Sequence, residues 1–246
     1  MQLIDVKGAL SLLATENQLS LMKVKVNSRA LSSQEAIGDP ERRDFPLLRG
    51  KEVLIQAEVE GGIGQAFTSD PISFSGTVSE LLNWKVERFG KQALEVAVLN
   101  ALCNKLGLAN NTIHCLNNEP EECAKKISSF LLEQHGLCNV GIVGYQPAIL
   151  EHCAQVFGTQ RVRITDLNPD NIGQVRYGVQ VWDGFSDTHK LIDESDVLLV
   201  TGTILVNGTH EELLSQIGDK PYYFYGTTCA GLAAINKMNR LCPMSR

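Results

Sequence analysis

The residues best suited to chemistry follow the predicted strands in the second half of the chain. They are glycine, threonine, asparagine and aspartate, which leave space for a ligand and supply hydrogen-bonding groups. Gly144 follows the first strand, Asp166, Asn168, Asn171 and Gly173 the second, Thr201, Gly202, Thr203, Asn207 and Thr209 the third, and Gly226 and Thr227 the fourth. In open α/β sheets, ligands bind beyond the carboxyl ends of the strands. We therefore predict that these residues line a small-ligand site.

The elements that position these residues alternate between strand and helix. Continuous apolar runs predict strands at Asn139–Gly144, Arg161–Thr165, Asp196–Thr201 and Pro221–Tyr225. Helical patterns lie between and after them, at Pro147–Phe157, Thr188–Glu194, His210–Ile217 and Gly231–Met238. This order is typical of a parallel sheet with helices on both faces, which predicts a Rossmann-like α/β domain.

The chain before residue 137 has an α+β pattern instead. Helices are predicted at Leu3–Ala14, Lys85–Leu106 and Glu119–His135, and strands at Leu19–Val26, Glu52–Val59 and Gly64–Thr68. The polar stretch Ser28–Gly50 predicts a long loop, the kind that is often functional or mobile. The change of pattern predicts two domains, residues 1–136 and residues 137–246, both within the usual size range.

Asp166 has two interpretations. It ends the second strand about 20 residues after Gly144, where a ribose-binding acid would lie in a dinucleotide-binding domain. The G-x-G-x-x-G fingerprint is absent, however, and Pro147 stands where the helix begins. Alternatively, Asp166 and Asn168 only organise an Asx turn before Pro169.

Three other motifs also have a structural alternative. Asn207 or Thr209 could cap the following helix instead of binding a ligand. The glycines of residues 61–64 join two strand patterns and lack the Lys-Ser/Thr of a phosphate-binding loop, which favours a hairpin turn. Arg42, Arg43 and Arg49 could clamp an anion, or they could simply be solvated.

The cysteines indicate a reducing compartment. There are seven, an odd number, and no C-x-x-C pair occurs among them. His114, Cys115, Cys123, His135 and Cys138 lie close in sequence, but they lack the spacing of a structural zinc site and are better explained as mostly buried small residues. Cys229 is the thiol nearest to the predicted ligand site, and its role is open, as is that of the 28–50 loop.

Charge and hydropathy exclude several classes of protein. The net charge is -6 at pH 7, and the sequence pI of about 5.4 is the opposite of what a non-specific nucleic-acid binder or a polybasic membrane-surface protein needs. We expect no membrane insertion, because no apolar run approaches the ~20 residues of a spanning helix. No secretory signal pattern is visible, so a cytoplasmic location is expected. A homodimer is expected only because two-fold assemblies are the commonest oligomers.

The second half resembles a known family. The segments DLNPDNIG (residues 166–173), Gly178-Val179, DVLLVTGTILVNGT (residues 196–209) and Tyr225-Gly226 resemble DUF364, a Rossmann-like family described as a heavy-metal chelation domain. The resemblance covers about residues 139–230. In that family the domain usually follows an enolase-N-terminal-like domain, DUF4213, which the first half resembles more loosely. The resemblance implies an interdomain cleft lined by the predicted site residues that lie between Asp166 and Thr227.

The leading functional hypothesis combines the resemblance with the residue types. Because Asp, Asn and Thr oxygens dominate these motifs, they do not resemble a soft thiolate site, and a chelated or organic metal complex is the expected form of any metal. We expect the cleft to bind a small anionic ligand or metal complex, in heavy-metal chelation or in synthesis or modification of a metal chelate. Two alternatives are an enzyme that uses S-adenosylmethionine or NAD and a non-catalytic protein-interaction module. No catalytic residue, and no metal ligand, is assigned from the sequence.

Overall fold

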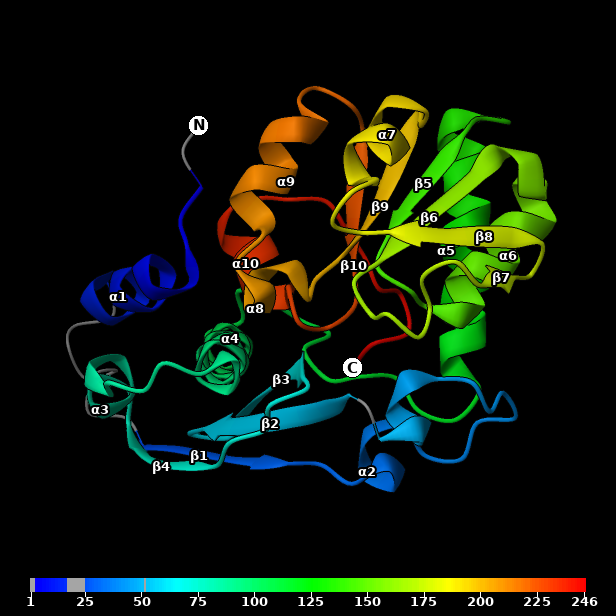
Figure 1. Cartoon of the computed structure of the whole chain (residues 1–246). Coiled ribbons are helices and arrows are strands. Elements are labelled where there is room, and N and C mark those ends of the chain that lie inside the picture. The colour runs from blue at the N-terminus through cyan, green and yellow to red at the C-terminus, as the bar shows by residue number, and fades with distance from the viewer. Residues whose placement is uncertain (1–2, 17–24, 51) are drawn as a thin grey trace.

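The computed structural model describes residues 3–16, 25–50 and 52–246, and it places two different sheets one above the other (Figure 1). The lower sheet is antiparallel with the order β3-β2-β1-β4, and the upper one has seven strands, six of them parallel. This mixed α/β architecture with two separate sheets confirms the predicted fold class.

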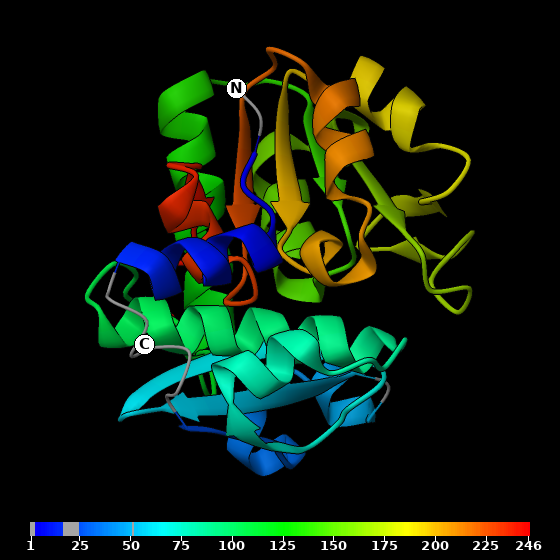
Figure 2. The ribbon, with the colours of Figure 1, turned by 90° about the vertical axis from the view of Figure 1, so that its left-hand side faces the viewer.

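The antiparallel sheet is assembled from four strands and one long helix. Its strands are β1 (Lys25–Ala30), β2 (Val53–Val59), β3 (Gly62–Thr68) and β4 (Phe74–Thr77), and helix α4 (Phe89–Lys105) packs on β2 and β3. Gly64 allows that packing, because a Cβ there would lie 2.2 Å from the backbone nitrogen of Ala101. Helix α4 thus lies between the antiparallel sheet and the rest of the molecule (Figure 2).

The glycines of residues 61–64 form a hairpin, as expected. Strands β2 and β3 pair antiparallel from Val53 with Thr68 to Val59 with Gly62. Glu60 and Gly61 have φ values of 48° and 84°, the left-handed conformation that tight two-residue hairpin turns require. These glycines are therefore not a phosphate-binding loop.

The parallel sheet has the strand order β11-β10-β9-β5-β6-β8-β7. Its strands are β5 (Val140–Val143), β6 (Val162–Asp166), β7 (Val175–Arg176), β8 (Val179–Asp183), β9 (Val197–Thr201), β10 (Tyr222–Tyr225) and β11 (Arg240–Leu241). From β5 the chain adds β6 and β8 on one side, and it then returns to add β9, β10 and β11 on the other. The strand order therefore reverses between β5 and β9, the place where doubly wound sheets bind ligands.

Helices cover both faces of the parallel sheet. They are α5 (Glu119–His135) and α6 (Pro147–Phe157) on one face, and α7 (Thr188–Asp193) and α9 (His210–Ile217) on the other (Figure 1). The strands alternate accordingly, since buried Leu199 packs with the α5 and α6 side chains and buried Leu198 with those of α7 and α9. Short helices α8 (Ile204–Asn207) and α10 (Ala230–Ile235) follow β9 and β10.

Several elements differ from the sequence-based predictions. The stretch Ser28–Gly50 is not one long loop, because it includes the end of β1, helix α2 (Ser33–Ile37) and a 3-10 turn at Pro46–Arg49. Helix α1 spans Val6–Glu16, and β1 begins at Lys25, so most of the strand predicted at Leu19–Val26 lies outside the described residues. Helix α3 (Val78–Asn83) and strands β4, β7, β8 and β11 were not predicted.

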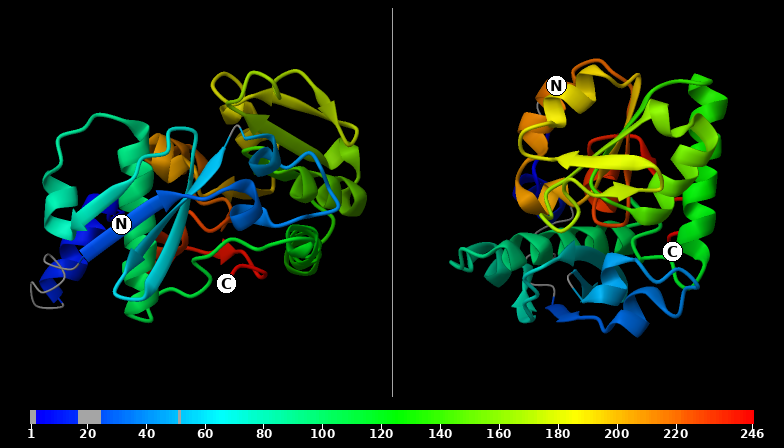
Figure 3. Two further views of the ribbon diagram at one scale, coloured as in Figure 1. Left: turned by 90° about the horizontal axis from the view of Figure 1, so that it is seen from below. Right: turned by 45° about the vertical axis from the view of Figure 1, so that its right-hand side comes forward.

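The two halves share their hydrophobic cores. One core joins α4 and the antiparallel sheet to β9, α8 and α9, and the other joins residues 31–54 to α5, α6 and the parallel sheet. Helix α2 lies below the lower end of α5 (Figure 3, right). The division into residues 1–136 and 137–246 stays a prediction, and α5 packs against α6 on its C-terminal side. Within the described residues, no helix has the length and apolar character needed to cross a membrane.

Candidate functional site

A cleft with two adjoining cavities lies at the carboxyl ends of β5, β6 and β9. We call the first the aromatic cavity, because Phe45, Phe67, Tyr145 and Tyr225 line it; its volume is about 140 Å³. The second, of about 490 Å³, is the threonine cavity, lined by Thr165, Thr188, Thr201, Thr203 and Thr209. Both share Glu52, Gly144, Asp166, Thr201 and Thr203, so these residues form the junction of the cleft.

Most of the predicted site residues line this cleft. They are Gly144, Asp166, Asn168, Thr201, Gly202, Thr203, Thr209 and Gly226. Three others line neither cavity: Asn171, Gly173 and Thr227. Thr227 is completely buried, and its hydroxyl has no hydrogen-bond partner in the structure, whereas its neighbour Thr228 does line the aromatic cavity. The side chain of Asn207 lies outside what the structure describes. Contact of any of these residues with a ligand stays a prediction.

Asp166 is both a structural residue and a wall of the cleft. One carboxylate oxygen accepts the N–H of Asn168 at 2.7 Å, which is the Asx turn considered from the sequence, and the Asn171 amide at 3.3 Å. The other accepts the N–H of Tyr145 at 2.7 Å, in the loop after β5. These bonds fix the carboxylate at the junction, and Asn171 contacts it although Asn171 itself lines neither cavity.

The junction is closely packed around Gly144. Its φ is +92°, and a Cβ there would lie 2.6 Å from the Thr201 methyl group, so only glycine fits without strain. The Tyr225 hydroxyl donates to the Gly144 carbonyl at 2.8 Å, and burial raises the pKa of this phenol. The hydroxyls of Thr201 and Thr203 lie 3.0 Å apart and form a hydrogen bond. Thr209 makes no side-chain capping bond to α9, so its hydroxyl is not used as a helix cap.

Glu52 is a site residue that sequence reasoning missed. It immediately precedes β2 of the antiparallel sheet, yet its side chain lines both cavities opposite the parallel sheet. Burial, together with the negative charge of Asp166, raises the pKa of its carboxyl group from 4.5 to about 7. One carboxyl group from each half of the molecule therefore faces the same cleft.

A group of thiols was also missed. Cys115, Cys123 and Cys242 line the aromatic cavity together with His114. Cys123 and Cys242 also affect one another: the interaction of their side chains lowers the pKa of the Cys242 thiol and raises that of Cys123. His135 and Cys138 do not belong to this group, since neither lines the cavity and His135 instead contacts the Tyr223 hydroxyl at 3.0 Å.

Cys229, the thiol expected near the site, is not available to a ligand. Cys229 is 1% exposed and lines neither cavity. Burial raises the pKa of this thiol to about 12. It packs beneath the site, where its sulfur leaves no room for a side chain at Gly202.

Asn100 of α4 positions the wall that contains Thr228. It is completely buried, and its amide nitrogen donates to the carbonyls of Gln65, Thr227 and Thr228 at 2.9, 3.1 and 3.0 Å. Its amide oxygen accepts the N–H of Gly231 at 2.7 Å. A single side chain thus ties strand β3 to the loop after β10.

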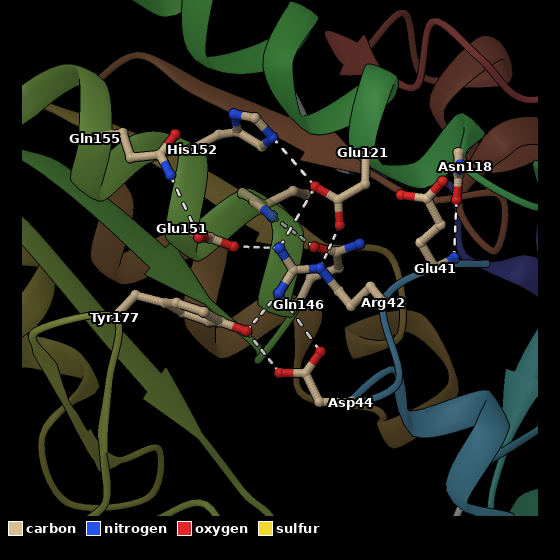
Figure 4. A network of polar contacts seen from close by, with 11 residues as sticks. Glu41, Arg42, Asp44, Asn118, Glu121, Gln146, Glu151, His152, Gln155 and Tyr177 are labelled. Carbon is tan, nitrogen blue, oxygen red and sulfur yellow. Dashed lines mark hydrogen bonds and ion pairs between the residues drawn. The ribbon is translucent and has the colours of Figure 1, made fainter.

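Arg42 has a structural role (Figure 4). Its guanidinium pairs with Glu121 of α5, Glu151 of α6 and Asp44, and it donates to the Tyr177 hydroxyl. Burial opposes its charge, but the hydrogen bonds with the two glutamates dominate and raise the pKa of Arg42. Arg43 pairs with Asp39, and none of Arg42, Arg43 and Arg49 lines the cleft. Of the two interpretations left open by the sequence, the structure therefore offers no support for an anion clamp in the cleft.

The charge of the cleft is negative. Among the described residues, its lining includes Glu52, Asp166 and Glu212 but no lysine or arginine. In the same part of the chain, no group of three or more His, Cys, Asp or Glu side chains is arranged to hold a metal ion. The lining therefore suits a cation or a positively charged complex better than an anion.

Comparison with known proteins identifies the second half. Residues 128–236 match the DUF364 family, whose description reads "Putative heavy-metal chelation". This part of the chain is a DUF364 domain. The resemblance of the first half to DUF4213 and to enolase N-terminal domains stays a prediction. None of the curated proteins compared with the sequence matches it.

Two solved structures are similar. A DUF364 protein of unknown function from Pyrococcus horikoshii superposes with a TM-score of 0.51 at 14% identity, covering 89% of this chain and 79% of that one. A DUF364 protein of unknown function from Desulfitobacterium hafniense has a TM-score of 0.48 at 13% identity, covering 75% of this chain and 72% of that one. The Pyrococcus structure supports the fold over most of the chain.

Donor atoms of two chemically different kinds line the cleft. Carboxylate and hydroxyl oxygens of Glu52, Asp166 and Thr201 gather at the junction and suit hard cations or the polar groups of a complex. The sulfur atoms of Cys115, Cys123 and Cys242 lie in the aromatic cavity and suit soft ions. Both sets belong to the same cleft.

Proposed function

We propose that the cleft binds a small metal complex with a net positive charge and that the protein acts in metal chelation. The observation that carries this proposal is that the carboxyl groups of Glu52 and Asp166 line the same cleft, while no lysine or arginine is among its described lining residues. A bound cation would stabilise both carboxylates, which otherwise oppose one another. From the sequence we expected either a small anionic ligand or a metal complex, and the negative charge of the cleft favours the metal complex.

The two cavities would hold different parts of such a complex. The threonine cavity offers hydroxyl groups to polar ligand atoms, and the aromatic cavity offers apolar walls at Phe45 and Phe67. The threonine cavity has a volume of about 490 Å³ and the aromatic cavity one of about 140 Å³. Taken together, the two lie within the range of small-molecule sites. A cytoplasmic location agrees with the free thiols and belongs to the proposal.

Charge preference tests the proposal. Cobalt(III) hexaammine, an inert cationic complex, and hexacyanoferrate(III), an inert anionic one, should be titrated calorimetrically into the protein at pH 8. We expect one saturable site for the cation and none for the anion. Glu52→Gln should weaken cation binding by about 10-fold or more, since it removes one charge from a partly buried site. Glu58→Gln, on the exposed side of β2, should not. Equal binding of the cation by both variants, or preference for the anion, would refute the proposal.

A second candidate is an enzyme that binds S-adenosylmethionine or NAD. The specific observation in its favour is the strand order around β5 and β9, which is that of dinucleotide-binding domains, with Asp166 at the end of the second strand. Against it, Asp166 already accepts three hydrogen bonds. Titration of both cofactors decides between the two, because this candidate requires binding that Asp166→Ala abolishes.

A further inference from the structure

The thiols of the aromatic cavity come from three separate parts of the chain. Cys123 lies in the second turn of α5, Cys242 follows β11, and Cys115 belongs to the connection between α4 and α5. Cys242 lies near the other two because the segment that follows it pairs with the connection between α4 and α5. There, Ile113 and Arg246 exchange two backbone hydrogen bonds of 2.7 and 2.8 Å. The thiol group is therefore a product of the complete fold.

The position of Cys242 is fixed by its own neighbours. Its carbonyl accepts the Ser245 hydroxyl at 2.7 Å, and Arg240 donates to the carbonyls of Gly226 and Asn111 at 2.8 and 2.7 Å. Cys123 lines the same cavity, and the two thiols shift each other's pKa. Two thiols from distant parts of the chain therefore line one cavity before any ligand arrives.

Apolar side chains line the cavity near this pair, and the positive charge of Arg240 acts on Cys242. Ile37, Phe45, Leu47, Ile127 and Leu241 line the same cavity, and Cys123 is 8% exposed. A hard cation would lose its water here without gaining oxygen ligands, whereas a soft cation gains two strong sulfur ligands. Because no group of three or more potential ligands is arranged for a metal within the described residues, the geometry suits an ion that accepts two ligands.

We propose that Cys123 and Cys242 form a two-thiolate site for a soft monovalent cation, such as Cu⁺ or Ag⁺, at the apolar end of the cleft, with Cys115 beside it. On binding, each thiol that still carries a proton releases it to water, and two S–metal bonds form. No electron is transferred. This inference deepens the proposed function, since it names which metal class the cleft takes and where, although its test does not depend on Glu52.

The probe is Ag⁺, which is redox-inert under the conditions needed. The reduced full-length protein should be titrated with Ag⁺ against a competing thiol, with binding followed by ultraviolet charge-transfer absorbance. We expect one tight site. Cys123→Ser and Cys242→Ser should each lose more than about 100-fold in affinity, since even loss of an outer-shell partner costs about 10- to 100-fold. Cys138→Ser, which changes a partly exposed thiol outside the cavity, should bind as the wild type does.

A second measurement guards against misfolded variants. In the wild-type protein, one equivalent of Ag⁺ should protect Cys123 and Cys242 from alkylation, read by mass spectrometry, and leave Cys138 reactive. Protection of other cysteines instead, or equal Ag⁺ affinity in all three variants, would overturn the inference. Glu52→Gln should keep the Ag⁺ site. If cation binding depends on Glu52 but the Ag⁺ site at the thiols is not found, this inference alone is rejected. If the Ag⁺ site is found but cation binding does not depend on Glu52, only the role of Glu52 is rejected.

Discussion

At the scale of single residues, the properties of the cleft depend on polar side chains that are buried away from water. Glu52 is the clearest case, because burial and Asp166 raise the pKa of its carboxyl group to about 7. Tyr225 and Asn100 are buried as well, but each has hydrogen-bond partners that fix its place. The chemistry of the site therefore depends on Glu52, and its shape on the other two.

Glu52 predicts a pH dependence of stability. The unfolded chain releases this proton near pH 4.5, whereas the folded protein keeps it to about pH 7. The folded state thus binds more protons in that window, so the free energy of unfolding falls as the pH rises from about 4.5 to 7. Glu52→Gln should remove up to about 3 kcal/mol of that fall, measured by urea denaturation at several pH values. Glu58→Gln should retain it. An unchanged pH profile in Glu52→Gln would contradict the assignment.

Asn100 predicts a large loss of stability. Asn100→Ala leaves three carbonyls and the Gly231 N–H without their partner in a buried place, which should lower the free energy of unfolding by about 2–4 kcal/mol. Asn83 is a matched control, because it is exposed and makes one bond, to the Ser79 carbonyl. Chemical denaturation measures both variants. Similar losses for the two would mean that Asn100 does not tie the halves together.

The sequence predicted the residues of the sheet edge but not those that face it. Gly144, Asp166 and Thr201 were found because each follows a strand with a clear apolar pattern. Glu52 and Cys242 could not be found in this way, since nothing in their local sequence distinguishes them and only the packing of the two halves brings them to the cleft. The pattern predicts Thr227, whereas the structure places Thr228 in the lining of the aromatic cavity, because a pattern of neighbours does not show which side chain points inward.

At the scale of elements, the Arg42 network joins the segment before β2 to α5 and α6. Phe45, Pro46 and Leu47 of that segment line the aromatic cavity, so its attachment also shapes the site. The strands and helices with strong periodicity, such as α5, α6 and α9, were predicted with their observed bounds. Short elements such as α2 and β8 were missed, because contacts with distant residues, and not a local sequence pattern, determine their structure.

Arg42 predicts a measurable contribution of this attachment. Arg42→Met leaves Glu121, Glu151 and Asp44 close together without their common cation, which should cost about 2 kcal/mol, below the range for fully buried pairs because these carboxylates are partly exposed. Limited proteolysis within residues 38–50 should become faster. Arg29→Met breaks the exposed pair with Glu35 and should have a much smaller effect. Equal effects of the two substitutions would show that the network does not hold the segment.

At the scale of the whole molecule, the cleft exists because two different sheets share their cores. Helix α4 contacts both β3 and α8, so it transmits the position of one half to the other (Figure 2). The sequence predicts the parallel sheet and the β2–β3 hairpin of the other sheet. It could not predict how the two sheets face one another, since that depends on side chains from distant segments in each core. The negative charge of the cleft is a property of this pairing and not of either half alone.

The most direct test of the central claim is mass spectrometry of the native protein, purified without a metal-affinity tag, combined with elemental analysis. The account predicts that the wild type retains a metal-containing small molecule at a ratio near one per chain. It also predicts that Glu52→Gln, purified in parallel, loses most of it, whereas Glu58→Gln retains it. Retention of a metal-free anionic molecule by all three proteins would contradict the account.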